Sequence, residues 1–434
     1  MKQFRRKTQN AIPSPVRFWF GQKPVLLVLL IIFPFFITSA GCQVIPYDPD
    51  AGNHPINSSS TQTGDQTSSG SAKTTGITGT SALGVTTTHK QATETGLPND
   101  DLLHDQVRQM TLDVKIGQLI MAGFNNVAEA EGLVREISPG GLILFRRNIQ
   151  TEQQTRQDIS TFQAAVEDGL PPLFIAVDQE GGTVSRLPAS AGVFESAQDI
   201  STRADVPYAV ASGERTGRIL REWGFNVNCA PVLDIGGNPD SKVIGTRAYG
   251  ETAGAVIVYG LAVLQGLQNT GMLTVVKHFP GHGGTTVDSH LSLPVIDQSL
   301  AELQEEALRP FIAAIDADAD MVMMAHIRFS QLDMRPASLS PVLVDTLLRH
   351  ELGFSGVVLT DDLTMGAITD QYEIGEAAVL AVEAGCDLLL VCHDMANVYL
   401  VRDALMDAVQ SGRLSEARID ASVERILLAK RRLS

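Results

Sequence analysis

The sequence predicts an α/β protein built mainly of a single (β/α)8 TIM-type barrel, preceded by a signal segment and a disordered linker. After Asp100, eight short apolar runs alternate with helix-like stretches. Most of these runs end in ionisable residues, as the strands of such barrels do at their functional face. An open, doubly wound parallel sheet is the alternative architecture. The expected divisions are residues 1–42, 43–99 and 100–434.

Residues 1–42 have the order of an export signal. Basic side chains precede an apolar run from Val25 to Ile37, and small residues then lead to Cys42. The run is too short to span a membrane comfortably. The ending Ala-Gly-Cys resembles a bacterial lipoprotein signal, so we expect a lipidated Cys42 and an exported protein that this lipid anchors to the membrane, with its folded domain outside the cytoplasm. An uncleaved anchor helix is the alternative.

Residues 43–99 are rich in Ser, Thr and Gly and contain few apolar side chains. Such a stretch cannot bury enough surface to fold, so we expect a flexible tether. The formal net charge of -16 argues against a nucleic-acid partner, because phosphate binding needs a basic face. Cys229, Cys386 and Cys392 lie in apolar runs without the CxxC spacing of zinc sites and are expected in the core.

The apolar runs are expected to be parallel strands that are buried on both faces. They begin at Ile116, Gly140, Pro172, Asn226, Leu273, Asp320, Gly356 and Cys386. Helical patterns lie between them, for example over residues 214–224, 255–271 and 373–385. Eight strand–helix units in this length fit a barrel with some long loops.

Six of these runs end in ionisable side chains although their interiors are apolar. Barrel active sites lie at the C-terminal ends of the strands, so this pattern predicts a polar cleft on one face. The residues concerned are Asp178, Glu180, Asp234, Lys277, His278, His326, Asp361, Asp362, His393 and Asp394.

The segment KHFPGHGGTTVDSH, residues 277–290, is the most informative stretch of the chain. Its glycines indicate a loop, and an Asp two residues before a His can orient the imidazole as a proton shuttle, which predicts this role for Asp288 and His290. A zinc site that uses His278 and His282 as well is an alternative. Because this HxxxH spacing lies on a Pro-Gly loop rather than a helix, no metal is expected. The Gly-rich loop lacks a Walker pattern, and no cofactor is expected.

Taken together, the motifs resemble glycoside hydrolase family 3, in particular its β-N-acetylglucosaminidase (β-N-acetylhexosaminidase) branch, from about Leu102 to Leu433. The resemblance implies a retaining exo-glycosidase that hydrolyses terminal β-linked N-acetylglucosamine from cell-wall fragments or chitooligosaccharides. The alternatives are a β-N-acetylglucosaminide phosphorylase and a non-catalytic, sugar-binding surface lipoprotein. The motifs are AVDQEGGTVSRL, NCAPVLDIGGNP, VIGTRAYG, KHFPGHG with VDSH, MMAHIRFSQLD, PASLSP and GFSGVVLTDDLTMGAI.

The resemblance also implies catalytic roles. Asp361 matches the nucleophile that forms a covalent glycosyl-enzyme. Its neighbour Asp362 is expected to point away or to support the site, because neighbours on a strand face opposite sides. His290 matches the general acid and base, with Asp288 as its orienting partner. If His290 does not have this role, Glu180 is the next candidate.

A further set of residues is expected, on the same resemblance, to bind the carbohydrate substrate: Asp178, Arg186, Arg247, Lys277 and His278. Structural roles are the alternatives for two of them. Arg186 would then lie on a helix surface, and Arg247 would pair with Asp234 to brace the barrel. His282 is expected to hold its loop by hydrogen bonds rather than to react.

Overall fold

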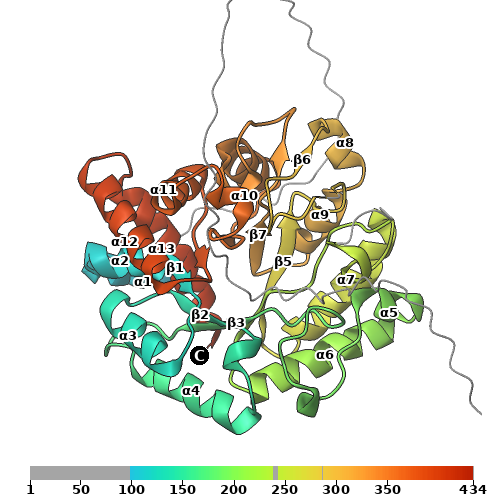
Figure 1. The fold of residues 1–434 in the computed structure, drawn as a ribbon, viewed down its shortest axis with the longest axis horizontal. Coiled ribbons are helices and arrows are strands. Elements are labelled where there is room, and N and C mark those ends of the chain that lie inside the picture. Colours follow the sequence, from blue (N-terminus) through green and yellow to red (C-terminus); the bar gives the residue numbers. More distant parts are fainter. Residues whose placement is uncertain (1–97, 238–242, 286, 434) are drawn as a thin grey trace, which may run out of the picture. The chain divides into compact units, whose positions relative to one another are not determined.

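The structure, a computed structural model, describes residues 98–237, 243–285 and 287–433. The predicted signal with Cys42 and nearly all of the predicted tether lie outside these residues. Within them, parallel strands form a central sheet and helices surround it (Figure 1). None of the helices in the described ranges is both long and apolar enough to cross a membrane.

All eight predicted strands are present, and every pairing between neighbours is parallel. Their order is β10-β1-β2-β3-β4-β5-β7-β9. The two edge strands meet at a parallel bridge between Leu359 and Leu388, so the sheet closes into a barrel by this narrow contact. The predicted (β/α)8 barrel is confirmed, and the open doubly wound sheet is wrong. The strands are β1 (Ile120–Ala122), β2 (Gly141–Leu144), β3 (Phe174–Val177), β4 (Val227–Asn228), β5 (Leu273–Phe279), β7 (Met321–Met324), β9 (Val357–Thr360) and β10 (Leu389–Val391).

The first apolar run differs from its prediction at its beginning. Residues from Ile116 to Gln118 end a helix, and the strand starts only at Ile120. The helix begins after Thr111, whose hydroxyl accepts a hydrogen bond from the amide of Val114. This cap starts a helical turn that the apolar pattern alone does not reveal.

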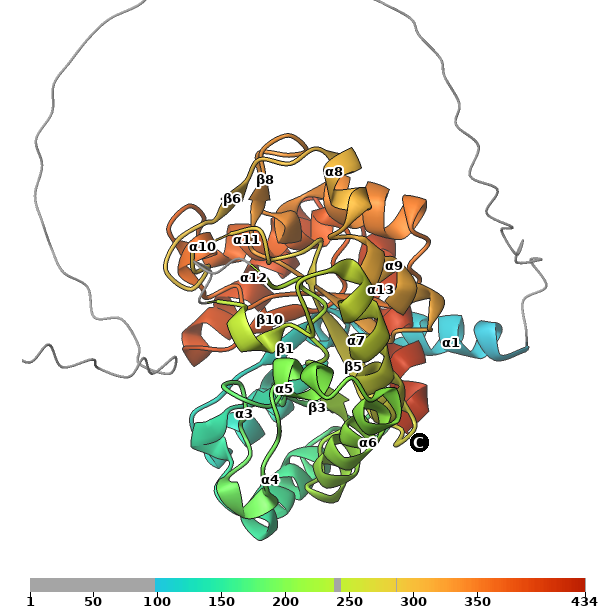
Figure 2. The same ribbon diagram turned by 90° about the vertical axis from the view of Figure 1, so that its right-hand side faces the viewer.

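Helices connect the strands and cover the outside of the barrel (Figures 1 and 2). The three helical patterns seen in the sequence correspond to α6, α7 and α11. The α-helices are α1 (Pro98–Gln109), α2 (Leu112–Gln118), α3 (Val127–Ile137), α4 (Glu152–Ala164), α5 (Ala197–Thr202), α6 (Val206–Glu222), α7 (Ala253–Gln268), α8 (Leu300–Glu305), α9 (Arg309–Asp316), α10 (Gly366–Thr369), α11 (Ile374–Ala384), α12 (Met395–Gln410) and α13 (Glu416–Lys430). Other helical segments are η1 (Arg146–Asn148), η2 (Ala189–Ala191), η3 (Gly245–Arg247), η4 (Ala337–Leu339), η5 (Val342–Glu351) and η6 (Arg431–Leu433).

The core consists of the strands and the inner faces of the helices. All residues of β2, β3, β5, β7 and β9 are buried, as expected for parallel strands covered on both sides. Cys229, Cys386 and Cys392 are buried, unpaired core residues, as predicted.

A second, two-stranded parallel sheet was not predicted. It joins β6 (Val295–Ile296) to β8 (Arg328–Phe329) in the chain segments that follow β5 and β7 (Figure 2). Two residues per strand leave no periodic pattern in a sequence. Its strand β6 begins shortly after the segment that carries Asp288 and His290.

Candidate active site

The predicted polar residues gather at the C-terminal ends of the strands. Asp178 directly follows β3 and Asp361 directly follows β9, while Lys277 and His278 are among the last three residues of β5. Because the strands are parallel, these ends meet on one face of the barrel. The expected cluster of polar residues is therefore present on this face.

Both Lys277 and His278 contribute to this cluster, although neighbours on a regular strand point to opposite faces. The pairing of β5 with β7 shifts its register between Val276 and Phe279. Irregularities of this kind re-aim side chains and are frequent next to active sites. The sequence predicted that both residues serve the site but contained no sign of the register shift.

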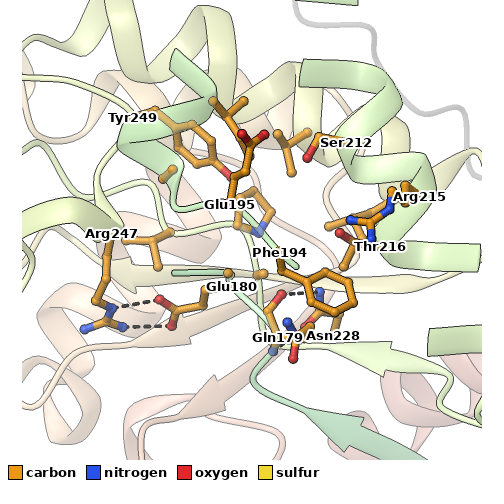
Figure 3. A pocket seen from close by; sticks show the side chains of 18 residues that line it. Gln179, Glu180, Phe194, Glu195, Ser212, Arg215, Thr216, Asn228, Arg247 and Tyr249 are labelled. Carbon is orange, nitrogen blue, oxygen red and sulfur yellow. Dashed lines mark hydrogen bonds and ion pairs between the residues drawn. The ribbon is translucent and has the colours of Figure 1, made fainter. Parts of the chain in front are cut away.

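Lys277 and Arg247 are joined by a buried carboxylate. Glu180 Oε1 lies 2.7 Å from Lys277 Nζ, and Arg247 grips both oxygens of Glu180 at 2.7 and 2.9 Å (Figure 3). Burial by itself would raise the pKa of Glu180, but the two cations outweigh it and hold this pKa well below its usual range. Glu180 is thus a permanent anion that braces two cations, which argues against its use as the general acid.

Asp178 is the second carboxylate on Lys277. Its Oδ1 accepts a hydrogen bond from Lys277 Nζ at 2.6 Å. Burial lowers the pKa of Lys277, but Asp178 and Glu180 reverse the effect and raise it, so the ammonium stays charged. A buried ammonium between two carboxylates is a strong donor toward a sugar hydroxyl.

Arg186 lies beside Asp178 rather than on a helix surface. Its Nη2 is 3.9 Å from Asp178 Oδ2, and its guanidinium lies 5.6 Å from the centre of the Phe145 ring. Its Nε is buried and has no hydrogen-bond partner among the described residues. A buried donor without a partner is costly unless a ligand satisfies it, which fits a substrate contact.

Asp234 pairs with His278 and not with Arg247. Asp234 Oδ2 lies 2.6 Å from His278 Nδ1, while His278 Nε2 lies 3.4 Å from Arg247 Nη2. Burial by itself would raise the pKa of Asp234. His278 and, to a lesser degree, His282 outweigh burial, so the pKa of Asp234 is lowered. The alternative in which Arg247 braces the barrel through Asp234 is therefore wrong, and Glu180 is the partner of Arg247 instead.

Asp361 is the carboxylate left without a counter-ion. Of Asp178, Glu180, Asp234, Asp361 and Asp362, it alone forms no ion pair within the described ranges. Burial by itself would raise its pKa. Three imidazoles outweigh burial and lower the pKa of Asp361 to about 2, namely those of His326, His278 and His290.

Asp362 bonds backbone amides beside Asp361, which fits the alternative that it supports the site. It is buried, and its Oδ1 accepts hydrogen bonds from the amides of Thr364 (3.0 Å) and Cys392 (3.1 Å). His326 supports the same turn, because its Nε2 lies 3.0 Å from the Asp362 carbonyl and its Nδ1 lies 2.7 Å from Ser338 Oγ. These contacts keep the backbone around Asp361 in place.

His290 is exposed on the loop that follows β5, and its imidazole is near enough to lower the pKa of Asp361. The carboxylate of Asp288 accepts a hydrogen bond from the backbone amide of His290 at 2.9 Å. No hydrogen bond joins Asp288 to the ring of His290 in the described part of the chain. The structure therefore places Asp288 next to His290, but the carboxylate of Asp288 binds the backbone amide of His290 and not its imidazole ring.

A pocket is lined in part by Glu180 and Arg247 (Figure 3). Phe194, Ser212 and Tyr249 are among the residues that line it, whereas Asp361 and His290 are not. This pocket therefore includes Arg247, one of the predicted substrate-binding residues, but not the predicted nucleophile. No group of three or more His, Cys, Asp or Glu side chains in residues 98–237, 243–285 and 287–433 is arranged to hold a metal ion.

Sequence reasoning missed two contributors to this face. It gave Glu180 only the role of a second candidate for the general acid and base, although its position three residues after the end of β3 could have suggested an ion pair with Lys277 and Arg247. It also missed Phe145, which follows β2 and contacts Arg186, Arg147 and His393. Nothing in the sequence indicated this role, because Phe145 looks like the last apolar residue of the predicted strand.

Comparison with known proteins identifies the family of this chain. Residues 111–429 match the family model described as the glycosyl hydrolase family 3 N terminal domain. Beta-hexosaminidase A of Pseudoalteromonas piscicida is 33% identical over 333 residues, which are 70% of this chain and 55% of that protein. The beta-hexosaminidase of Stenotrophomonas maltophilia (strain K279a) is 36% identical over 307 residues, which are 69% of this chain and 88% of that protein.

A solved structure is also similar. A glycoside hydrolase family 3 beta-N-acetylglucosaminidase from Paenibacillus sp. str. FPU-7 superimposes with a TM-score of 0.73 at 43% identity, covering 74% of this chain and 62% of that one. The chain thus spans little more than half the length of some of the relatives it matches.

The barrel and these matches define a glycoside hydrolase. The chain belongs to glycosyl hydrolase family 3. Its matches confirm the predicted resemblance to the β-N-acetylhexosaminidase branch of that family.

Proposed function

We propose that this protein is a retaining exo-glycosidase that removes terminal β-linked N-acetylglucosamine from cell-wall fragments or chitooligosaccharides. The observation that carries the proposal is the unpaired, ionised carboxylate of Asp361 at the end of β9. The carboxylates of the other strand ends already pair with a cation or an imidazole, namely those of Asp178, Glu180, Asp234 and Asp362. The similarity to proteins named beta-hexosaminidase supports the choice of sugar.

In the first step, an oxygen of Asp361 attacks the anomeric carbon and forms a covalent ester with it. The bond from that carbon to the leaving oxygen breaks, and protonated His290 gives its proton to this oxygen. In the second step, neutral His290 takes a proton from water. The water oxygen then bonds to the anomeric carbon and releases Asp361, so both inversions together retain the configuration.

The remaining residues of the cluster are suited to hold the sugar hydroxyls. Lys277, Arg186 and Arg247 supply charged donors, and Asp178 supplies an acceptor. The pairing of each cation with a carboxylate holds the side chains in one geometry before the substrate arrives. Preorganised donors of this kind avoid the cost of ordering them during the reaction.

We also propose that the protein is exported and anchored by a lipid on Cys42. The support is the order of basic, apolar and small residues before that cysteine. The folded domain would then meet its substrate outside the cytoplasm.

Release of chromophore from a nitrophenyl β-N-acetylglucosaminide, with and without phosphate, tests the activity. We expect turnover that does not depend on phosphate, with free N-acetylglucosamine as the product. A sugar phosphate as the product would show a phosphorylase, and binding without turnover would show a sugar-binding protein.

The nucleophile is tested separately. A slow 2-fluoro glycoside should label Asp361 in the wild-type protein, and Asp361→Asn should remove nearly all turnover and leave the fold intact. A label on Asp362 would contradict the assignment. Inverted product stereochemistry without any label would reject the two-step mechanism.

A further inference from the structure

His282 is a buried histidine that the proposed reaction does not use. Its side chain lies in the cluster, where its ring meets the ring of His278 edge-on at 5.7 Å. Its backbone amide donates a hydrogen bond to Asp234 Oδ1 at 2.6 Å, while the other oxygen of Asp234 holds His278. One carboxylate therefore fixes both His278 and the start of the loop that leads to His290.

The imidazole of His282 reaches the far end of the same loop. Its Nε2 lies 3.3 Å from the hydroxyl oxygen of Ser289, which is the residue between Asp288 and His290. Both side chains are buried, at 2% and 3% relative exposure. This contact crosses the loop and closes it.

The segment around Ser289 is also bonded to the start of α10, which begins five residues after the proposed nucleophile Asp361. The amide of Ala367 donates to the carbonyl of Ser289 at 3.1 Å, and the amide of Gly366 donates to the carbonyl of His290 at 3.3 Å. A Cβ at Gly366 would lie 2.8 Å from that carbonyl oxygen, so only glycine allows this approach. The two segments thus hold each other at a fixed separation.

We propose that His282 is a positioning residue that, by binding Ser289, sets the place of the His290 imidazole above Asp361. This inference rests on the proposed function, because it requires His290 to act as the acid and base. Proton transfer demands hydrogen-bonding distance in the reacting complex, and a displacement of about 1 Å can cost roughly 100-fold in rate. An exposed imidazole on a glycine-rich loop needs such an anchor.

The chemistry of His282 suits a permanent anchor better than a proton carrier. Burial and, to a lesser degree, the neighbouring His278 lower its pKa to about 4. The ring therefore remains neutral over the range in which the enzyme would work, and its bond to Ser289 does not change with pH there. Its Nδ1 is buried and has no partner among the described residues, so Ser289 is the side chain that the ring holds.

The test compares two serines of one loop. Ser289→Ala removes the anchored hydroxyl, and Ser292→Ala removes the side-chain hydroxyl of an exposed serine three positions further on. We expect Ser289→Ala to lower kcat on a natural disaccharide roughly 10- to 100-fold and leave binding of free N-acetylglucosamine unchanged. Ser292→Ala should match the wild type, and His282→Gln, which keeps a polar group near Nε2, should retain more activity than His282→Ala.

A double-variant cycle separates positioning from a general structural role. In a His290→Ala background, Ser289→Ala should have no further effect, because there is no imidazole left to position. Equal activity of Ser289→Ala and Ser292→Ala, or independent losses in the cycle, would overturn the proposal. Full activity of His290→Ala would refute the acid and base assignment itself and the positioning role with it, so the two failures are distinguishable.

Discussion

The carboxylate of Asp288 binds the main-chain amide of His290 at 2.9 Å. A contact from an Asp side chain to the amide two residues later is typical of an Asx turn, which shapes the local backbone. Asp288 therefore has a conformational role in addition to any charge it offers the imidazole. The two roles can be separated, because an asparagine oxygen also accepts a hydrogen bond.

We expect Asp288→Asn to keep the turn and lose the charge, whereas Asp288→Ala loses both. His290→Ala should slow substrates with poor leaving groups by about 10²–10⁴-fold, the usual contribution of a proton shuttle. Asp288→Asn should have a smaller effect than this, and Asp288→Ala should lie between the two. The measurement is kcat/KM on a disaccharide. If the Asn and Ala variants are equally impaired, the turn contributes nothing and the charge alone is important.

Glu180→Gln should destabilise the fold strongly. The variant leaves Lys277 and Arg247 buried without their shared carboxylate, and breaking a buried pair in this way costs about 3–5 kcal/mol. The control is Glu376→Gln, whose glutamate pairs with Arg413 at the surface, and there we expect a loss of at most about 1 kcal/mol. Urea unfolding measures both, and similar losses would contradict the role given to Glu180.

The stabilisation that Glu180 gives to the folded protein has a defined pH dependence. Because the pKa of Glu180 is lowered in the folded protein, its stabilisation is present above the unfolded value and is lost as acid protonates the folded state. The difference between wild type and Glu180→Gln should therefore persist through neutral and mildly acidic pH. It should narrow only in strong acid.

Lys430→Met should stabilise the protein at neutral pH. Lys430 is buried, bonds Gln118 Oε1 at 2.8 Å and has no carboxylate partner within the described ranges, and burial lowers its pKa to about 7. Above this value the unfolded chain binds a proton that the folded protein does not, so wild-type stability rises with pH by at most about 1.4 kcal/mol per unit. The advantage of the variant should therefore shrink from about pH 7 to about pH 10. A constant advantage in urea unfolding would contradict this.

A truncated protein that begins at Pro98 should fold and keep its activity. Helix α1 packs against α13, and its side chains Leu103 and Val107 are buried in the core. Removal of α1 as well, by starting at Thr111, should lower the Tm because both buried side chains are lost. Loss of activity in a folded protein that begins at Pro98 would show that the preceding residues contribute to function.

Cys42→Ser tests the proposed location. The substitution removes the only thiol in the expected signal, so the protein should either leave the membrane fraction or retain an uncleaved signal. Cell fractionation and the apparent mass of the protein distinguish these results. Wild-type protein found free in the cytoplasm would contradict the proposal.

Much of the fold could be predicted from local patterns. The strands are apolar on both faces because helices cover a parallel sheet, and this leaves continuous apolar runs that a sequence displays directly. The candidate site residues could be proposed because a barrel collects its functional groups at one end of each strand. Asp178, Lys277 and Asp361 were chosen in part on this ground, and the structure places all three at strand ends.

Which acidic side chain pairs with which basic one became clear only from the three-dimensional structure. Arg247 turned out to pair with Glu180, 67 positions away, rather than with Asp234. The register shift in β5 brings Lys277 and His278 into one cluster, and the contact of His282 with Ser289 closes the loop. The strands, the helices and the residue types at the strand ends could be predicted from the sequence alone, because the pattern of apolar residues along the chain marks where each buried strand ends. The partners depend on distances between strands that are remote in the chain, and only the closed barrel sets those distances.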